Sequence, residues 1–133
     1  ANIDGFGLSS LLADVAITIL PPQGYLEMLG LMANARLVLT DSGGIQEETT
    51  ALAVPCLTMR DNTERPITVS QGTNTLVGRD IEATIACVDA IFAGGGKRGR
   101  VPEFWDGHAA ERIAADLTAW LGLSQECPEV VGA

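Results

Sequence analysis

The segment Asp41-Ser42-Gly43-Gly44 directly follows a short apolar run that ends at Thr40. This order is typical of a buried strand that leads into a helix. Adjacent glycines let a ligand approach the backbone without meeting a side chain. The unpaired N–H groups at a helix start, together with the Ser42 hydroxyl, are suited to hold a phosphate. A turn that only caps the helix is the commoner explanation of such residues and stays open as the alternative.

Two acidic residues, Glu47 and Glu48, come soon after the glycines. One interpretation is that acids near a helix start interact favourably with the helix dipole. The other is that one of them accepts hydrogen bonds from the hydroxyls of a ribose, as acids do in other nucleotide-binding folds. Glu48 lies four residues after Gly44 and therefore on the same helix face, whereas Glu47 is turned by about 100° from it.

A charged segment, RDNTERP at residues 60–66, follows the next apolar run. We expect it to leave the carboxyl end of a strand, which is the edge where ligands bind in open parallel sheets. A guanidinium suits a phosphate because its fork donates hydrogen bonds in pairs. The alternative is an exposed ion pair of Arg65 with Glu64 or Asp61, which would contribute little to stability.

Short apolar runs alternate with helical patterns, and these elements must position the polar segments. Strands are predicted at residues 15–20, 37–40, 54–59 and 74–77, and helices at residues 25–35, 45–53, 80–93 and 108–121. Asp80 is a suitable N-cap for the third of these helices. The alternation predicts an α/β fold, in which helices on both faces cover a Rossmann-like parallel sheet.

We expect residues 1–133 to form a single domain, with little regular structure at either end. Residues 1–12 are interpreted as a frayed start or the edge of an excised piece, and residues 122–133 as a loose tail. The glycine-rich segment 94–99 is predicted to be a mobile, solvated loop. In the last helix, the residues expected to face inward are Ala109, Ile113, Leu117 and Trp120 or Leu121, and Trp105 and Trp120 are expected to be packing residues.

Composition and charge exclude several classes of protein. The net charge of −9 argues against nucleic acid as a partner, and no apolar run reaches the ~18 residues that a membrane helix needs. Cys56, Cys87 and Cys127 are widely spaced, which favours a reducing cytoplasm over a disulfide framework and offers no metal-ligand pattern. Cys56 is predicted to be buried. His108 is interpreted as a surface or capping residue. We expect neither a metal nor a cofactor.

Several linked motifs resemble one family. The motifs LVLTDSGGIQEE, VPCLTMRDNTERP and GTNTLVG resemble the C-terminal half of the non-hydrolysing UDP-N-acetylglucosamine 2-epimerases, in the same order and with compatible spacing. The preceding PPQGYLEMLGLMANA resembles that family's helix before the serine-glycine loop. The resemblance covers residues 20–78, and residues 106–121 more weakly, whereas residues 1–12 do not resemble the family. It implies the C-terminal domain of a B-type glycosyltransferase fold.

The resemblance also implies seven substrate-binding residues, namely Gln23, Met28, Ser42, Gly43, Gly44, Glu48 and Arg65. Ser42 and the two glycines would bind the diphosphate, Glu48 the ribose hydroxyls, and Arg65 the nucleotide portion. Gln23 and the backbone near Met28 would lie beside the uracil. Met28 stands where the family commonly has an aromatic residue.

The family interconverts UDP-N-acetylglucosamine and UDP-N-acetylmannosamine by eliminating UDP and adding it back. The resemblance therefore implies that this chain holds UDP or UDP-N-acetylglucosamine, while an N-terminal half of the same enzyme supplies the acid/base groups. No catalytic residue is assigned to this chain, and we expect it to be inactive alone. The alternatives are the donor-binding domain of a UDP-sugar glycosyltransferase and a UDP-binding fragment that catalyses nothing. The sequence leaves open whether the protein forms a homo-oligomer.

Overall fold

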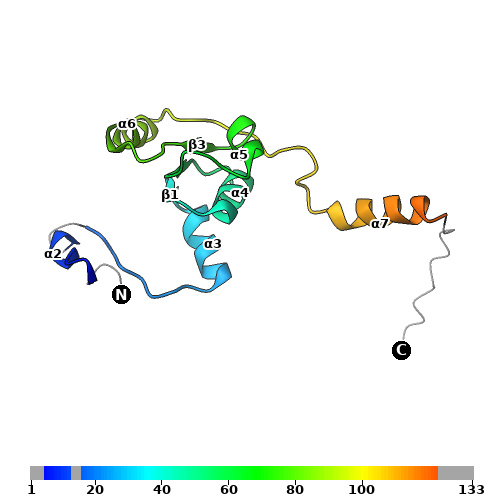
Figure 1. Cartoon of the computed structure of the whole chain (residues 1–133), viewed down its shortest axis with the longest axis horizontal. Helices are drawn as coiled ribbons and strands as arrows, with labels where there is room; N and C mark the ends of the chain where they lie inside the picture. Colours follow the sequence, from blue (N-terminus) through cyan, green and yellow to red (C-terminus); the bar gives the residue numbers. More distant parts are fainter. Residues whose placement is uncertain (1–4, 13–15, 123–133) are drawn as a thin grey trace.

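The computed structural model describes residues 5–12 and 16–122, and its centre is a parallel sheet (Figure 1). The three strands lie in the order β1-β2-β3 and are β1 (Val38–Thr40), β2 (Cys56–Thr58) and β3 (Asn74–Leu76). Their register aligns Thr40, Thr58 and Leu76 at the carboxyl edge of the sheet. The predicted α/β fold with a parallel sheet is confirmed, and three of the four predicted strands form it.

Helices connect and extend these strands. They are α2 (Ser9–Leu12), α3 (Tyr25–Ala33), α4 (Gly43–Ala51), α5 (Pro66–Ser70), α6 (Ile81–Phe92) and α7 (Ala109–Trp120). The short helices α2 and α5 were not predicted, since neither is long enough to show a hydrophobic period. The predicted cap of α6 is confirmed, because the Asp80 carboxylate accepts a hydrogen bond from the Ala83 amide at 3.0 Å.

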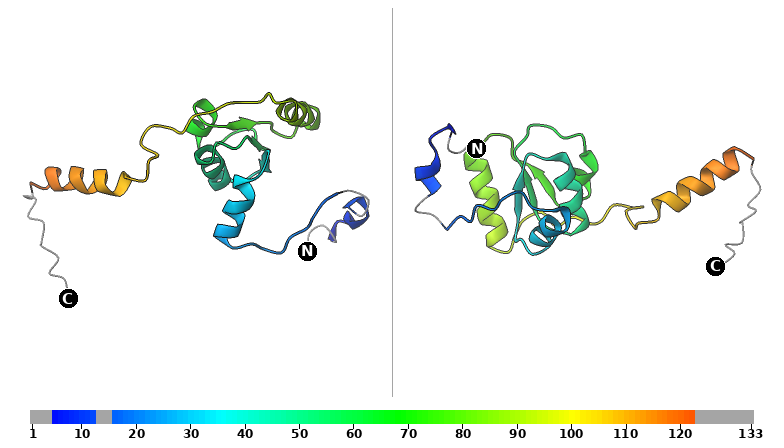
Figure 2. Two further views of the ribbon diagram at one scale, coloured as in Figure 1. Left: turned by 180° about the vertical axis from the view of Figure 1, so that it is seen from behind. Right: turned by 90° about the horizontal axis from the view of Figure 1, so that it is seen from below.

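The two faces of the sheet differ in chemistry. On the face covered by α6, Leu57, Val77 and Ile91 form the apolar core. The other face lies against α4 and α5, which contact β2 and β3 (Figure 2). Successive side chains of a strand point to opposite faces, so Cys56 and Thr58 lie on the α4 side. Cys56 is fully buried, as predicted, and burial raises the pKa of its thiol.

The prediction of a strand at residues 15–20 is wrong for the part that the structure describes. Residues 16–20 are extended but pair with no described strand, and Ile17 and Ile19 are more than half exposed. Val15 lies outside the described residues. A β-branched run predicts an extended chain, but a strand forms only when a neighbour satisfies its backbone groups. Within the described chain, β1 pairs with β2 alone.

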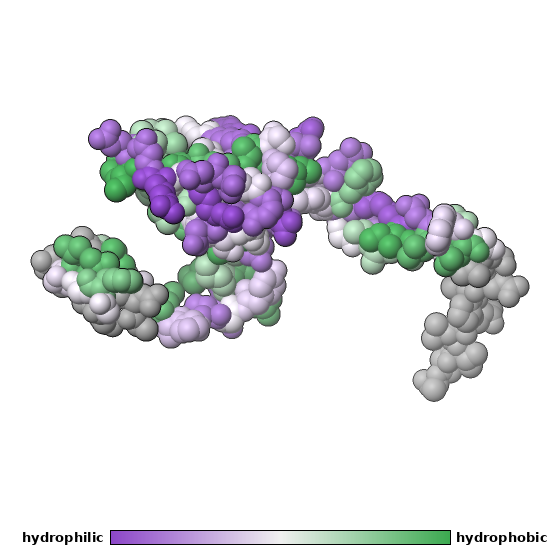
Figure 3. All heavy atoms as spheres, in the orientation of Figure 1, coloured by the Kyte–Doolittle hydropathy of each residue, from purple (hydrophilic) through white to green (hydrophobic). Residues whose placement is uncertain are grey.

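The predicted inward face of the last helix is also wrong. Helix α7 projects away from the sheet, and Ile113, Leu117 and Trp120 are 58%, 52% and 82% exposed. Apolar side chains gather along one side of α7 (Figure 3). The period of apolar residues predicts which side of a helix is apolar. It does not predict which other element packs against that side.

The glycine-rich segment 94–99 is anchored at Lys97 and Gly99, whereas its other residues are exposed. The Lys97 ammonium donates hydrogen bonds to the carbonyl of Val69 and, at 2.8 Å, to that of Asn74. Its burial lowers the pKa of Lys97. A Cβ atom on Gly99 would lie only 2.2 Å from the carbonyl carbon of Gly72, so the two chains pass in close contact. The expectation of a solvated segment is therefore wrong for Lys97, while Gly94, Gly95, Gly96 and Arg98 are exposed.

The ends of the chain are only partly described. Residues 1–4, 13–15 and 123–133 lie outside the described residues, and the expected loose tail falls almost entirely among them. Part of the segment expected to be frayed forms α2. None of the described helices has the length and apolar character that a membrane crossing requires.

Candidate functional site

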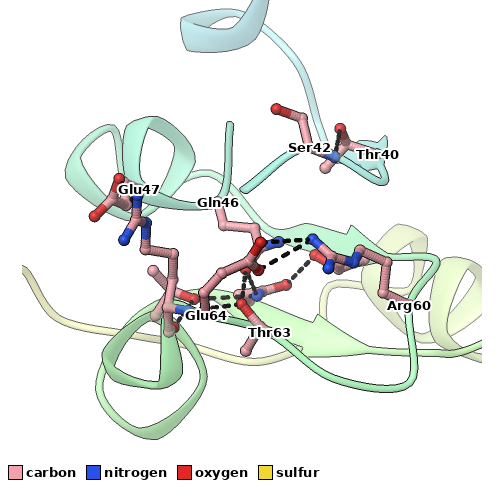
Figure 4. Close-up of polar contacts among 11 residues, drawn as sticks. Thr40, Ser42, Gln46, Glu47, Arg60, Thr63 and Glu64 are labelled. Carbon is pink, nitrogen blue, oxygen red and sulfur yellow. Dashed lines mark hydrogen bonds and ion pairs between the residues drawn. The ribbon is translucent and has the colours of Figure 1, made fainter. Parts of the chain in front are cut away.

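The opening of α4 lies at the carboxyl edge of the sheet, directly after β1. Ser42 is the N-cap residue in an extended conformation, and its amide donates to the Thr40 hydroxyl at 3.0 Å (Figure 4). The Ser42 side chain makes no capping hydrogen bond, in contrast to Asp80. Capping by Ser42 therefore does not explain this turn.

Helix α4 begins at Gly43, two residues earlier than predicted, so the glycine pair forms its first turn. The first amides of a helix have no acceptor within the helix and carry the positive end of its dipole. Gly44 is exposed, and a Cβ atom there would meet nothing within 4 Å. The amides of this turn are thus open to a ligand.

The early helix start also changes how the two acids are interpreted. Glu47 and Glu48 fall in the second turn, and the first turn of α4 holds no acid. Because the dipole effect fades beyond the first turn, it does not account for both residues. Glu47 and Glu48 line a hollow of about 330 Å³ together with Ala51 and Trp105. Trp105 is half-buried there, as expected of a packing residue.

The charged loop at residues 60–66 contains two ion pairs, one of which joins it to α4. Arg65 Nε lies 3.2 Å from Glu47 Oε2, and Arg60 Nη1 lies 3.0 Å from Glu64 Oε2 (Figure 4). The alternative partners proposed for Arg65, Glu64 and Asp61, are therefore wrong. The backbone amide of Glu64 and the Arg60 guanidinium lower the pKa of the Glu64 carboxyl. This carboxylate is 3.9 Å from where a Gly43 Cβ would lie, so the loop borders the opening of α4.

A group of polar residues, buried except for the half-buried Thr63 and here called the polar network, joins this loop to α4 and the sheet. Its members are Gln46, Thr58, Thr63, Thr68 and Asn74. The sequence analysis missed it because hydrophobic periodicity does not register polar residues in a core. A signal was present, since Gln46, Thr49 and Thr50 have the i, i+3, i+4 spacing of one buried helix face.

Gln23 and Met28 lie in a different place from the other candidates. Both line an apolar hollow of about 460 Å³, which lies between residues 18–23, α3 and the amino end of β1. The lining residues come from residues 18–38, so the structure does not bring this pair together with Ser42. The Gln23 amide donates to the carbonyl of Pro21 at 2.7 Å.

The remaining candidates for chemistry are accounted for by local contacts. His108 is exposed and its Nδ1 lies 2.7 Å from a Glu111 oxygen, in agreement with its interpretation as a surface residue. Asp106 pairs with Arg112, whose guanidinium holds the pKa of that carboxyl well below its usual range. Among the described residues, no cluster of three His, Cys, Asp or Glu side chains could hold a metal ion.

Comparison with known proteins agrees with this arrangement. Residues 7–118 match the family model described as UDP-N-acetylglucosamine 2-epimerase, so the match begins within the segment that showed no resemblance. The enzyme of that name from Methanocaldococcus jannaschii is 51% identical over 102 residues, covering 77% of this chain and 27% of the relative. The Escherichia coli K12 enzyme is 42% identical over 106 residues, covering 76% and 28%.

Solved structures show the same relationship. The M. jannaschii enzyme in complex with UDP-GlcNAc and UDP superposes with a TM-score of 0.74 at 47% identity, covering 88% of this chain and 32% of that one. The Neisseria meningitidis enzyme bound to UDP-GlcNAc gives 0.69 at 30% identity, covering 89% and 33%. The chain therefore spans about a quarter to a third of the length of these relatives. It belongs to the UDP-N-acetylglucosamine 2-epimerase family.

Proposed function

We propose that this chain binds the diphosphate of a UDP-sugar at the opening of α4, as the UDP-binding part of a UDP-N-acetylglucosamine 2-epimerase. The observation that carries the proposal is the first turn of α4, where Gly43 and Gly44 leave amides open at the carboxyl edge of the sheet. Such amides bind an anion at short range even in a chain of net charge −9. Neither the family match nor the relatives favour a glycosyltransferase.

The remaining substrate-binding roles are proposed for side chains of α4, the adjacent loop and the segment before β1. The Ser42 hydroxyl, which makes no capping bond, donates to the same diphosphate. Glu48, one turn along α4 from Gly44, accepts hydrogen bonds from the ribose. Arg65 approaches the nucleotide from the adjacent loop. For the uracil, the apolar hollow beside Gln23 and Met28 offers a surface of suitable character.

In the proposed reaction, this domain stabilises a leaving group. When UDP is eliminated from the sugar, the oxygen of its diphosphate leaves with the electron pair of the broken bond. Fixed donors at α4 would stabilise that charge, and they would hold UDP until it adds back with the opposite configuration at the second carbon of the sugar. Groups in the rest of the enzyme would move the proton.

The proposed setting is a larger enzyme in the cytoplasm. An N-terminal half is proposed as the partner because the relatives are three to four times longer than the matched region. Cys56 and Cys87 are free thiols, which supports a reducing compartment. A homo-oligomer remains compatible with this proposal.

Glu48→Gln is expected to weaken binding of UDP by about 1.5–3 kcal/mol, because a neutral amide replaces a charged acceptor of ribose hydroxyls. Isothermal titration calorimetry of the 133-residue chain with UDP measures this loss. Glu82→Gln, which makes the same change in the exposed first turn of α6, is the control and should bind like the wild type. A Glu48→Gln chain that binds UDP as tightly as the control would show that Glu48 does not contact the ribose.

A further inference from the structure

The Thr63 hydroxyl is the point at which the charged loop is tied to α4. It donates a hydrogen bond to Gln46 Oε1 at 2.6 Å and accepts one from the Arg65 amide at 2.9 Å. One hydroxyl thus joins the first turn of α4 to the backbone of Arg65. Figure 4 shows Thr63 and Gln46 facing each other between the loop and the helix.

The Gln46 side chain is itself fixed in place. It is fully buried, and the same oxygen accepts a second hydrogen bond from Asn74 Nδ2 at 3.0 Å. Asn74 is in turn held by the hydroxyls of Thr58, at 2.7 Å, and Thr68, at 3.1 Å. Because the hydrogen bonds that Asn74 makes with Gln46 and the two threonines are buried, Gln46 presents a rigid acceptor to Thr63 rather than a mobile one.

Arg65 is therefore held to α4 at two points. Thr63 holds its backbone amide, and Glu47 holds its guanidinium at 3.2 Å. Gln46 and Glu47 are adjacent residues of α4 that directly follow Gly43-Gly44-Ile45. An arginine fixed in this way does not first have to be ordered before it contacts a ligand, and this lowers the entropic cost of binding.

We propose that Thr63 and Gln46 are positioning residues, which hold Arg65 beside the opening of α4 so that it contacts the diphosphate of UDP. This inference rests on the proposed UDP site and adds two residues that do not touch the ligand. It differs from a purely structural role, in which the polar network stabilises the domain and leaves Arg65 unaffected.

A double-mutant cycle between Thr63 and Arg65, measured by calorimetry with UDP, tests the proposal. Thr63→Val removes both hydrogen bonds of the hydroxyl at nearly constant volume, and it should weaken UDP binding about tenfold. In an Arg65→Ala chain the same change should weaken binding less than about twofold, because no guanidinium remains to be positioned. Thr63→Ser keeps the hydroxyl and should bind UDP within about twofold of the wild type.

The control is Thr73→Val, since Thr73 is buried, and its hydroxyl has no hydrogen-bond partner among the described residues. This variant should bind UDP like the wild type. If Thr63→Val does not fold, as judged by circular dichroism, Thr63→Ala replaces it, because alanine places no methyl group against Gln46 Oε1. Equal losses in the two Arg65 backgrounds, or a Thr63→Ser chain as weak as Thr63→Val, would overturn the positioning role. A wild-type chain that fails to bind UDP would instead overturn the proposed function.

Discussion

A Gly44→Asp chain is expected to bind UDP at least about a hundredfold more weakly than the wild type, and to unfold at the same or a higher temperature. Gly44 is exposed, has no positive φ, and leaves room for a side chain. An acid in the first turn of a helix interacts favourably with its dipole, and aspartate is a better helix former than glycine. The fold should therefore tolerate the change.

The loss of binding follows from charge. Two like unit charges 4 Å apart near a protein surface repel by about 4 kcal/mol, and each 1.4 kcal/mol corresponds to a tenfold change in affinity. An aspartate at the opening of α4 would bring its carboxylate close to the diphosphate. Calorimetry with UDP and thermal unfolding by circular dichroism measure the two effects in the same samples.

Gly30→Asp provides the matched control. Gly30 is an exposed glycine within α3 where a Cβ atom would also meet nothing within 4 Å. The substitution adds the same charge on α3 instead of in the first turn of α4, so the affinity for UDP should stay close to that of the wild type. Unchanged affinity in Gly44→Asp, or an equal loss in both variants, would mean that the diphosphate does not lie at the opening of α4.

Asn74→Ala is expected to lower the free energy of unfolding by about 3–5 kcal/mol. The Asn74 side chain is fully buried and hydrogen-bonds Gln46, Thr58 and Thr68. Its removal leaves buried polar partners unsatisfied, at about 1–3 kcal/mol for each group, and opens a cavity as well. Single domains are typically stable by only about 5–15 kcal/mol, so a large fraction of the variant would be unfolded on mild destabilisation.

Urea unfolding followed by circular dichroism measures this change. Thr73→Val is again the control, because its buried hydroxyl has no partner to lose and a methyl group fits the same space. It should unfold at the same or a higher urea concentration than the wild type. If Asn74→Ala lost less than about 1 kcal/mol, the polar network would not be what holds α4 against the sheet.

The strands and helices around the site were predictable because local patterns coincide there with tertiary structure. The runs that end at Thr40 and at Met59 are apolar and β-branched, and neighbouring strands satisfy their backbone groups. Asp80 caps α6 through a contact three residues away, which a sequence pattern can encode. Gly43 and Gly44 could be predicted to follow a strand, and the structure places them at the carboxyl edge of the sheet.

Other features depend on contacts that no local pattern contains. Residues 16–20 have the composition of a strand but no described partner, and α7 has an apolar side that nothing in the described chain covers. From its sequence surroundings Lys97 is expected in a solvated loop, but its ammonium donates hydrogen bonds to the carbonyls of Val69 and Asn74. The partners of Lys97 lie 28 and 23 residues away along the sequence.

The polar network could not be predicted for a related reason. The hydrogen bond between Thr63 and Gln46 spans 17 residues of sequence, and the one between Asn74 and Gln46 spans 28. Only the folded chain brings these residues together. Their types suggest surface residues, since isolated polar groups are costly to bury. Arg65 and Glu47 are also far apart in the sequence and lie on different elements. For this reason the ion pair weighed for Arg65 was one with the nearby Glu64 or Asp61.

The central claim is that amides in the first turn of α4 bind the diphosphate of UDP. Titration of the ¹⁵N-labelled chain with UDP, followed by amide NMR spectra, observes those groups directly. The amide signals of Gly43, Gly44 and Ile45 should shift saturably with UDP and much less with uridine, which lacks the phosphates. Saturable shifts confined to other residues, or equal shifts with uridine, would contradict the account.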